Sequence, residues 1–139
     1  MKVMVLVKAT AQSEAGQLPS EAEFKAMGDY NEALVAAGIL LAGEGLHPSR
    51  RGHRVRFSGT GAPQVSDGPF ASPGTLVAGF WLWQVRSMDE ALEWIQRAPF
   101  TSGEEIELRQ VMAEDDLGEA FTDALRAQEQ RLRERIGGP

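Results

Sequence analysis

Several stretches of the chain have the length and side-chain pattern of β-strands. Residues 2–8 form an almost continuous, valine-rich apolar run that is too short for a typical helix, which predicts a strand covered on both faces. In the most apolar stretch, 76–85, Phe80 and Leu82 alternate with Trp81 and Trp83, so both faces of this strand are apolar. Four further strands are expected at 39–46, 53–58, 62–66 and 105–112.

Three helices are expected between and after these strands. Ser20 and Glu23 have the spacing of a capping box, and apolar residues at helical intervals follow up to Gly38. Ser87 and Glu90 repeat this pattern before a helix that is closed off by a proline. Residues 114–136 predict a polar helix with an apolar stripe, whose acids come early and whose arginines come late, as the helix dipole favours.

The order of these elements predicts the fold. It is β-α-β-β-β-β-α-β followed by a helix, and if the two short strands form an inserted hairpin, the rest is the ferredoxin-like β-α-β-β-α-β plan. We therefore predict an α+β domain over residues 1–113 and a C-terminal helical extension over 114–139. The helices suffice for one face of the sheet. We expect the other face, with Trp81 or Trp83 on it, to pack on a second copy and form a homodimer, a dimeric α+β barrel.

Composition removes several classes of function. The chain has 20 acidic and 14 basic residues and a net charge of −6, which argues against a nucleic-acid partner. Cysteine is absent, and with it disulfides, thiol nucleophiles and iron–sulfur clusters. The apolar start is too short for a signal peptide or a membrane span, so we expect a cytoplasmic protein with no membrane partner. The one basic cluster, at 50–56, suggests a solvated face or a dimer rim.

The common catalytic and ligand-binding motifs are missing. The sequence has no Gly-rich loop that would cradle a phosphate, so no nucleotide cofactor is expected. His47 and His53 lack a third ligand at a suitable spacing, so no metal site is expected. A Ser66-His47-Asp67 triad could be assembled, but no nucleophile elbow surrounds Ser66.

A set of short motifs, taken in order, connects the chain to a known family. Taken alone, Asp67-Gly68-Pro69-Phe70 is a turn. Together with the motifs around it, it makes the chain resemble the YCII-related family, specifically the DGPF branch that is named after these four residues. The other stretches that carry the resemblance are MVLVKAT at 4–10, SEAG at 13–16, AGEGLHPS at 42–49, RVRFSG at 54–59, AGFW at 78–81, EALEW at 90–94, and residues 105–111.

The resemblance implies a dimeric α+β barrel with a cleft between the sheet and its partner. It also implies that a histidine and an aspartate are the polar pair of that cleft, and His47 and Asp67 are the residues that match. A histidine beside a carboxylate is a plausible general acid–base, whereas the alternative is that both residues only stabilise their turns. We expect Lys8, Glu44 and Ser66 to be further ligand contacts.

Two functions are consistent with these motifs and candidate residues. The first is a cofactor-free acid–base enzyme that acts on an unknown small molecule. The alternative is a non-catalytic ligand-binding or regulatory protein, since members of this branch are suspected partners of extracytoplasmic-function sigma factors. One departure bears on both: where the branch usually has Ala-Glu-x-Lys-Glu, this chain has Ala-Ser-Pro-Gly-Thr at 71–75, which predicts an uncharged, tight turn.

Overall fold

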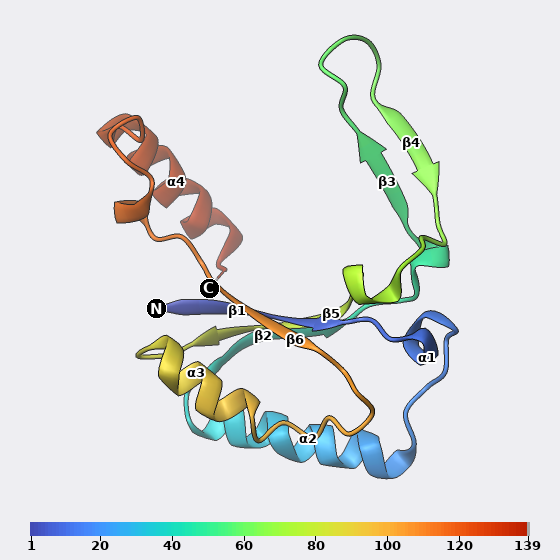
Figure 1. Cartoon of the computed structure of the whole chain (residues 1–139). Coiled ribbons are helices and arrows are strands. Elements are labelled where there is room, and N and C mark those ends of the chain that lie inside the picture. The colour runs from blue at the N-terminus through green and yellow to red at the C-terminus, as the bar shows by residue number, and fades with distance from the viewer. Residues whose placement is uncertain (139) are drawn as a thin grey trace.

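The fold is built on one four-stranded antiparallel sheet. The computed structural model describes residues 1–138. The strands run in the order β2-β5-β1-β6 and every neighbouring pair is antiparallel (Figure 1). This is the ferredoxin-like order, as the sequence predicted. The bounds are β1 Lys2–Lys8, β2 Leu40–Gly45, β5 Val77–Gln84 and β6 Ile106–Gln110.

Two helices, α2 (Glu21–Ala36) and α3 (Met88–Ile95), cover the same face of the sheet (Figure 1). Both start where the sequence predicted. The complete capping box forms at α2, where the Glu23 carboxylate also accepts from the backbone of Ser20. At α3 the Ser87 hydroxyl accepts from the Glu90 amide, but the Glu90 carboxylate bonds the Arg86 guanidinium instead. A short helix that the sequence analysis does not include, α1 (Ala11–Glu14), follows β1.

The core lies between the helices and the sheet. Val3, Val5, Leu34 and Trp83 are completely buried there, and Trp81 is nearly so. Both tryptophans point toward the helices because odd-numbered residues of β5 share that face. The expectation that one of them faces a second copy is therefore wrong.

The other face of the sheet carries a second apolar set and no layer of helices. Met4, Leu6, Phe80 and Leu82 alternate with the core residues and are half-buried. Two arms rise from this open face (Figure 1). One is the hairpin of β3 (His53–Arg56) and β4 (Gln64–Asp67), and the other is the C-terminal helix α4 (Asp123–Ile136).

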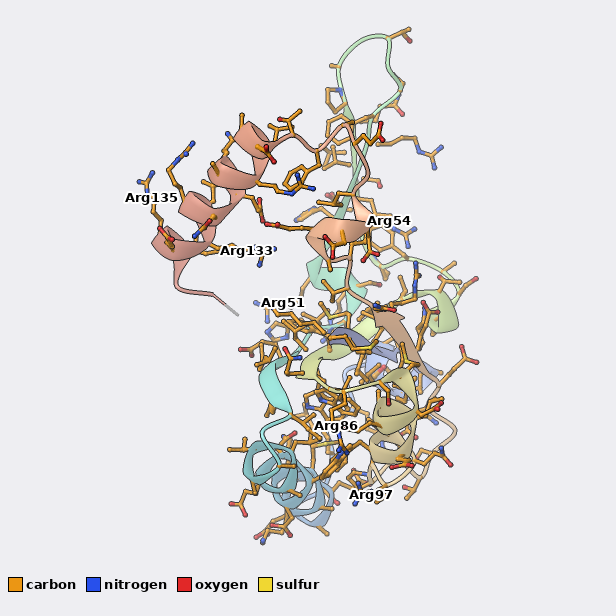
Figure 2. The ribbon with its side chains drawn as sticks, turned by 90° about the vertical axis from the view of Figure 1, so that its left-hand side faces the viewer. Arg51, Arg54, Arg86, Arg97, Arg133 and Arg135 are labelled. Carbon is orange, nitrogen blue, oxygen red and sulfur yellow. The ribbon has the colours of Figure 1, made fainter. Side chains whose placement is uncertain are left out.

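The C-terminal helix is shorter than predicted. The turn Glu114–Asp116 (η3) is followed by Gly118 with φ +74°, a left-handed conformation that ends helical geometry. A new helix then begins after Thr122, whose hydroxyl caps it, and Arg126 connects it to Glu114 at 3.7 Å. None of the described residues 123–136 is buried, and Figure 2 shows Arg133 and Arg135 extending from this helix.

The sole tyrosine of the chain provides a test of the core. The Tyr30 hydroxyl donates to the Trp94 carbonyl at 2.6 Å, and burial raises the pKa of Tyr30 to about 12. The folded state therefore keeps its proton above the ordinary tyrosine pKa of about 10, so stability is full below that value and falls as pH rises toward about 12. Ultraviolet titration of tyrosinate should have its midpoint near the raised value, and Tyr30→Phe should remove the signal and this part of the alkaline destabilisation. A midpoint near 10 would contradict the burial.

Candidate functional site at the hairpin root

The hairpin root brings a histidine and an aspartate together. His53 opens β3 and Asp67 closes β4, and the register sets these two residues directly opposite each other. His53 Nδ1 lies 2.9 Å from Asp67 Oδ1. The side chains are 65% and 81% exposed, and within residues 1–138 no hydrogen-bond partner is found for His53 Nε2. One ring nitrogen is thus held by a carboxylate while the other faces solvent.

The predicted partner of Asp67, His47, makes a different contact. Arg51 Nη1 lies 2.9 Å from His47 Nε2 and 3.3 Å from His47 Nδ1. A guanidinium only donates, so a ring nitrogen of His47 is the acceptor. The predicted pairing of His47 with Asp67 is therefore corrected to His53 with Asp67. The physical reason is the hairpin register, which makes His53 and Asp67 a cross-strand pair whose side chains lie on the same face.

The Asp-Gly-Pro-Phe turn is packed against the turn formed by Ser49–Arg51 (η1). The Gly68 amide donates to the Gly52 carbonyl at 2.9 Å, and the Phe70 amide donates to Ser49 Oγ at 2.9 Å. A Cβ on Gly68 would lie 1.7 Å from the Ser49 carbonyl oxygen, so no side chain fits there. The Arg54 guanidinium covers the Phe70 ring at 3.9 Å. The motif therefore attaches the hairpin to the rest of the chain and so positions Asp67.

Helix α1 is hydrogen-bonded to the turn formed by Ser49–Arg51. The Glu14 carboxylate accepts from the Ser49 amide at 2.9 Å and from the Ser49 hydroxyl at 2.5 Å. These hydrogen bonds hold the pKa of the Glu14 carboxyl below its ordinary value, with a smaller contribution from the charge of Arg50. Ser49 thereby links Glu14 to Phe70, and the hairpin root becomes one connected network.

The three further predicted ligand contacts lie apart from the His53–Asp67 pair. Ser66 is on β4 opposite Arg54, so its side chain is on the other face of the hairpin. Lys8 ends β1 and pairs with Glu107 at 3.6 Å. Glu44 is exposed on β2, opposite Phe80. The structure therefore does not gather these residues around one ligand position.

The uncharged stretch 71–75 forms the tight turn that its sequence predicted. Pro73–Thr75 (η2) is a single short helical turn, in which the Thr75 amide donates to the Ser72 carbonyl at 2.9 Å. The left-handed conformation falls on Ser72, with φ 61°, and not on Gly74. A side chain at Gly74 would meet open space.

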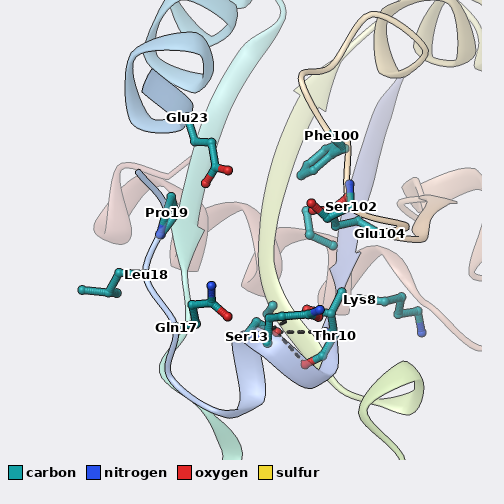
Figure 3. Close-up of a pocket in the computed structure, with 13 residues that line it drawn as sticks. Lys8, Thr10, Ser13, Gln17, Leu18, Pro19, Glu23, Phe100, Ser102 and Glu104 are labelled. Atoms are coloured by element: carbon teal, nitrogen blue, oxygen red, sulfur yellow. Dashed lines mark hydrogen bonds between the residues drawn. The ribbon is translucent and has the colours of Figure 1, made fainter. Parts of the chain in front are cut away.

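A second candidate site lies on the helix side of the sheet. Two adjoining cavities of about 420 and 470 Å³ share Val7, Pro19, Ala78 and Phe100 in their walls. Figure 3 shows the polar end of this space. The sequence pattern predicts no cavity between α2 and the sheet, because such a cavity depends on how far the helix stands from the strands.

The described residues carry neither a metal cluster nor a membrane span. No three His, Asp or Glu side chains among residues 1–138 are grouped so that they could hold a metal ion. Over the same range, every helix is too short or too polar to cross a bilayer.

The sheet order, the two helices on one face and the inserted hairpin define a ferredoxin-like α+β protein. The sequence model of the YCII-related domain matches residues 1–115, and the chain belongs to this family. This confirms the resemblance found in the sequence motifs.

The chain was also compared with individual proteins. The solved structure of a 5-chloro-2-hydroxyhydroquinone dehydrochlorinase from Burkholderia phenoliruptrix AC1100, in complex with 2,5-dihydroxybenzoquinone, is similar to this chain with a TM-score of 0.44 and 17% sequence identity. The match covers 84% of this chain and 99% of that chain. A search of curated protein sequences found no match.

The close approach at Gly68 predicts a large effect from one methyl group. Gly68→Ala should lower the free energy of unfolding by about 3 kcal/mol, because the new Cβ overlaps the backbone of Ser49 and forces the two turns apart. Gly74→Ala is the matched control, since its Cβ meets no atom within 4 Å, and it should change stability by less than about 0.5 kcal/mol. Urea unfolding measures both, and equal midpoints would show that the turns are not packed together.

Proposed function

We propose that this protein acts as a homodimer on a small, negatively charged organic molecule, with His53 as general acid–base and Asp67 as its orienting partner. The observation that carries the proposal is the 2.9 Å contact between His53 Nδ1 and Asp67 Oδ1, which leaves Nε2 open to a ligand. If the proton of the neutral imidazole is on Nδ1, this N–H donates a hydrogen bond to the Asp67 carboxylate. Nε2 then has the free lone pair of a base.

The dimer is supported by the two arms. An isolated two-stranded hairpin is marginally stable in water, and so is a single helix of about 14 residues. Here the hairpin exposes Val55 and Val65, and α4 exposes Leu125 and Leu132. A second copy that covers the open face of the sheet would bury these residues together with Phe80 and Leu82.

The same coverage would change the setting of the acid–base pair. His53 and Val55 share one face of the hairpin with their partners Asp67 and Val65. A surface that packs on the two valines therefore reaches the His53–Asp67 pair as well. Partial removal of water strengthens the interaction between the imidazole and the carboxylate.

The charges at the hairpin root favour an anionic substrate. Arg50 and Arg51 follow Ser49, whereas Arg54 lies on the other face of the hairpin, over the Phe70 ring. The carboxylate of Glu14 is occupied by Ser49. A ligand carboxylate or a developing enolate would be stabilised by the guanidinium groups of Arg50 and Arg51 while Nε2 accepts or returns a proton.

The alternative function, a non-catalytic regulatory partner such as one for an extracytoplasmic-function sigma factor, is favoured by α4. Its exposed Leu125, Leu132 and Ile136 form an apolar stripe that a protein partner could cover. In that case the His53–Asp67 pair only stabilises the hairpin. The two predictions below separate the functions.

Self-association should depend on the exposed apolar face of the hairpin. Sedimentation of the wild type should give twice the chain mass of 15.1 kDa. Val65→Asp should raise the dissociation constant about 100-fold, because it buries an unpaired charge at the interface. Val35→Asp on α2 is the control, since Val35 is 62% exposed and Val65 is 65% exposed. A wild type that stays monomeric at micromolar concentration, or equal effects of both changes, would contradict the dimer.

Base catalysis should depend on His53 and not on His47. A nitrobenzisoxazole that carries a carboxylate is a suitable probe, because a base that takes its carbon-bound proton breaks the N–O bond and releases a coloured phenolate. His53→Ala should lower the rate about 100-fold and Asp67→Asn about tenfold, while His47→Ala leaves it unchanged. A wild-type rate no higher than buffer, or equal loss in His47→Ala, would reject the acid–base role and favour the regulatory function.

A further inference from the structure

The helix-side cavity has a floor without side chains. Gly45 of β2 and Gly79 of β5 are directly opposite in the sheet, and both line the larger of the two adjoining spaces. A Cβ on Gly79 would lie 3.0 Å from the Glu44 carbonyl oxygen, whereas a Cβ on Gly45 would meet no atom within 4 Å. On the helix side of the sheet, the backbone at Gly45 and Gly79 is therefore not covered by side chains of its own. Two residues further along β5, on the same side, the Trp81 side chain belongs to the core.

Two walls of this space are aromatic rings. Trp81 donates from Nε1 to Asn31 Oδ1 at 3.0 Å, which holds the indole against α2. The Phe100 ring meets the Trp81 ring edge-on, with centroids 6.0 Å apart. Met27 adds a flexible apolar wall. Bare backbone below and rigid rings beside it make a slot that suits a flat apolar group.

The mouth of the cavity is acidic. Glu23 and Glu104 line it, and each uses Oε2 for a backbone amide, of Ser20 and Ser102 respectively. Among the described residues, neither Oε1 has a hydrogen-bond partner. Lys8 is the single cation in the lining, and its ammonium points away from the cavity toward Glu107 (Figure 3). Two carboxylates therefore face the entrance without a counter-charge.

We propose that this cavity binds a small amine that carries an aromatic or other planar apolar ring. The ring would lie on the bare backbone of Gly45 and Gly79, beside the paired rings of Trp81 and Phe100. The ammonium group would lie at the mouth, beside Glu104 and Glu23. This site is separate from the hairpin root, whose arginines favour the opposite charge.

Phenethylamine is the probe, with phenylethanol and phenylacetate as its neutral and anionic counterparts. Titration followed by amide and indole NMR should show saturable binding of the amine, with shifts at the Trp81 indole and at Gly45 and Gly79. Phenylethanol should bind more weakly and phenylacetate not at all. No saturable shift up to millimolar amine, or equal binding of the anion, would overturn the proposal.

Variants then test the slot and the mouth separately. Gly45→Val fills the slot where the backbone has room for a side chain, so it should fold normally and weaken amine binding about tenfold. Gly28→Val on α2, whose Cβ also meets open space, is the matched control and should bind as the wild type does. Glu104→Gln should weaken the amine about fivefold and leave phenylethanol unchanged. Unchanged amine binding in Gly45→Val with a native spectrum would place the ligand elsewhere.

Discussion

Two helices can cover only one face of a four-stranded sheet, and the remaining structure depends on this limit. Because β5 is apolar on both sides, Trp81 and Trp83 fill the covered face while Phe80 and Leu82 are left on the open one. The chain does not close that face with a third layer. It extends a hairpin and a helix from it, and both arms keep apolar residues exposed. A second copy is the simplest surface that would cover the open face of the sheet, the hairpin and the C-terminal helix at the same time.

The motif that identifies the branch by sequence has a structural explanation here. Gly68 leaves room for the Ser49 carbonyl, and the Ser49 hydroxyl donates to Glu14 while accepting from the Phe70 amide. Asp67 is thereby presented at a fixed point at the end of β4, where His53 meets it. The acid–base pair that we propose is thus a consequence of how the turn is packed, because the same contacts that attach the hairpin also orient the carboxylate.

Local sequence patterns predicted the helices and strands well. Contacts between residues that are distant in the sequence were predicted less well. The capping residues Ser20 and Ser87 marked both core helices, because a cap depends on neighbours three residues away. Gly118 divided the expected C-terminal helix, a break that its glycine could have signalled. The predicted partner of Asp67 was wrong because the register of the hairpin depends on how its seven-residue loop, from Phe57 to Pro63, closes. The helix-side cavity has a sequence signal only in Gly43 and Gly45, because glycines inside a strand leave backbone that another group can approach closely.

We infer that a second copy covers the open face of the sheet and, with it, the face of the hairpin that carries the His53–Asp67 pair. Isotope-filtered NOE spectroscopy on a mixture of labelled and unlabelled chains tests this directly, because it detects only contacts between two copies. We expect intermolecular cross-peaks from the methyl groups of Val55 and Val65 and from the His53 ring. Cross-peaks confined to other surfaces, such as the outer side of α2, or no intermolecular cross-peaks at all, would contradict it.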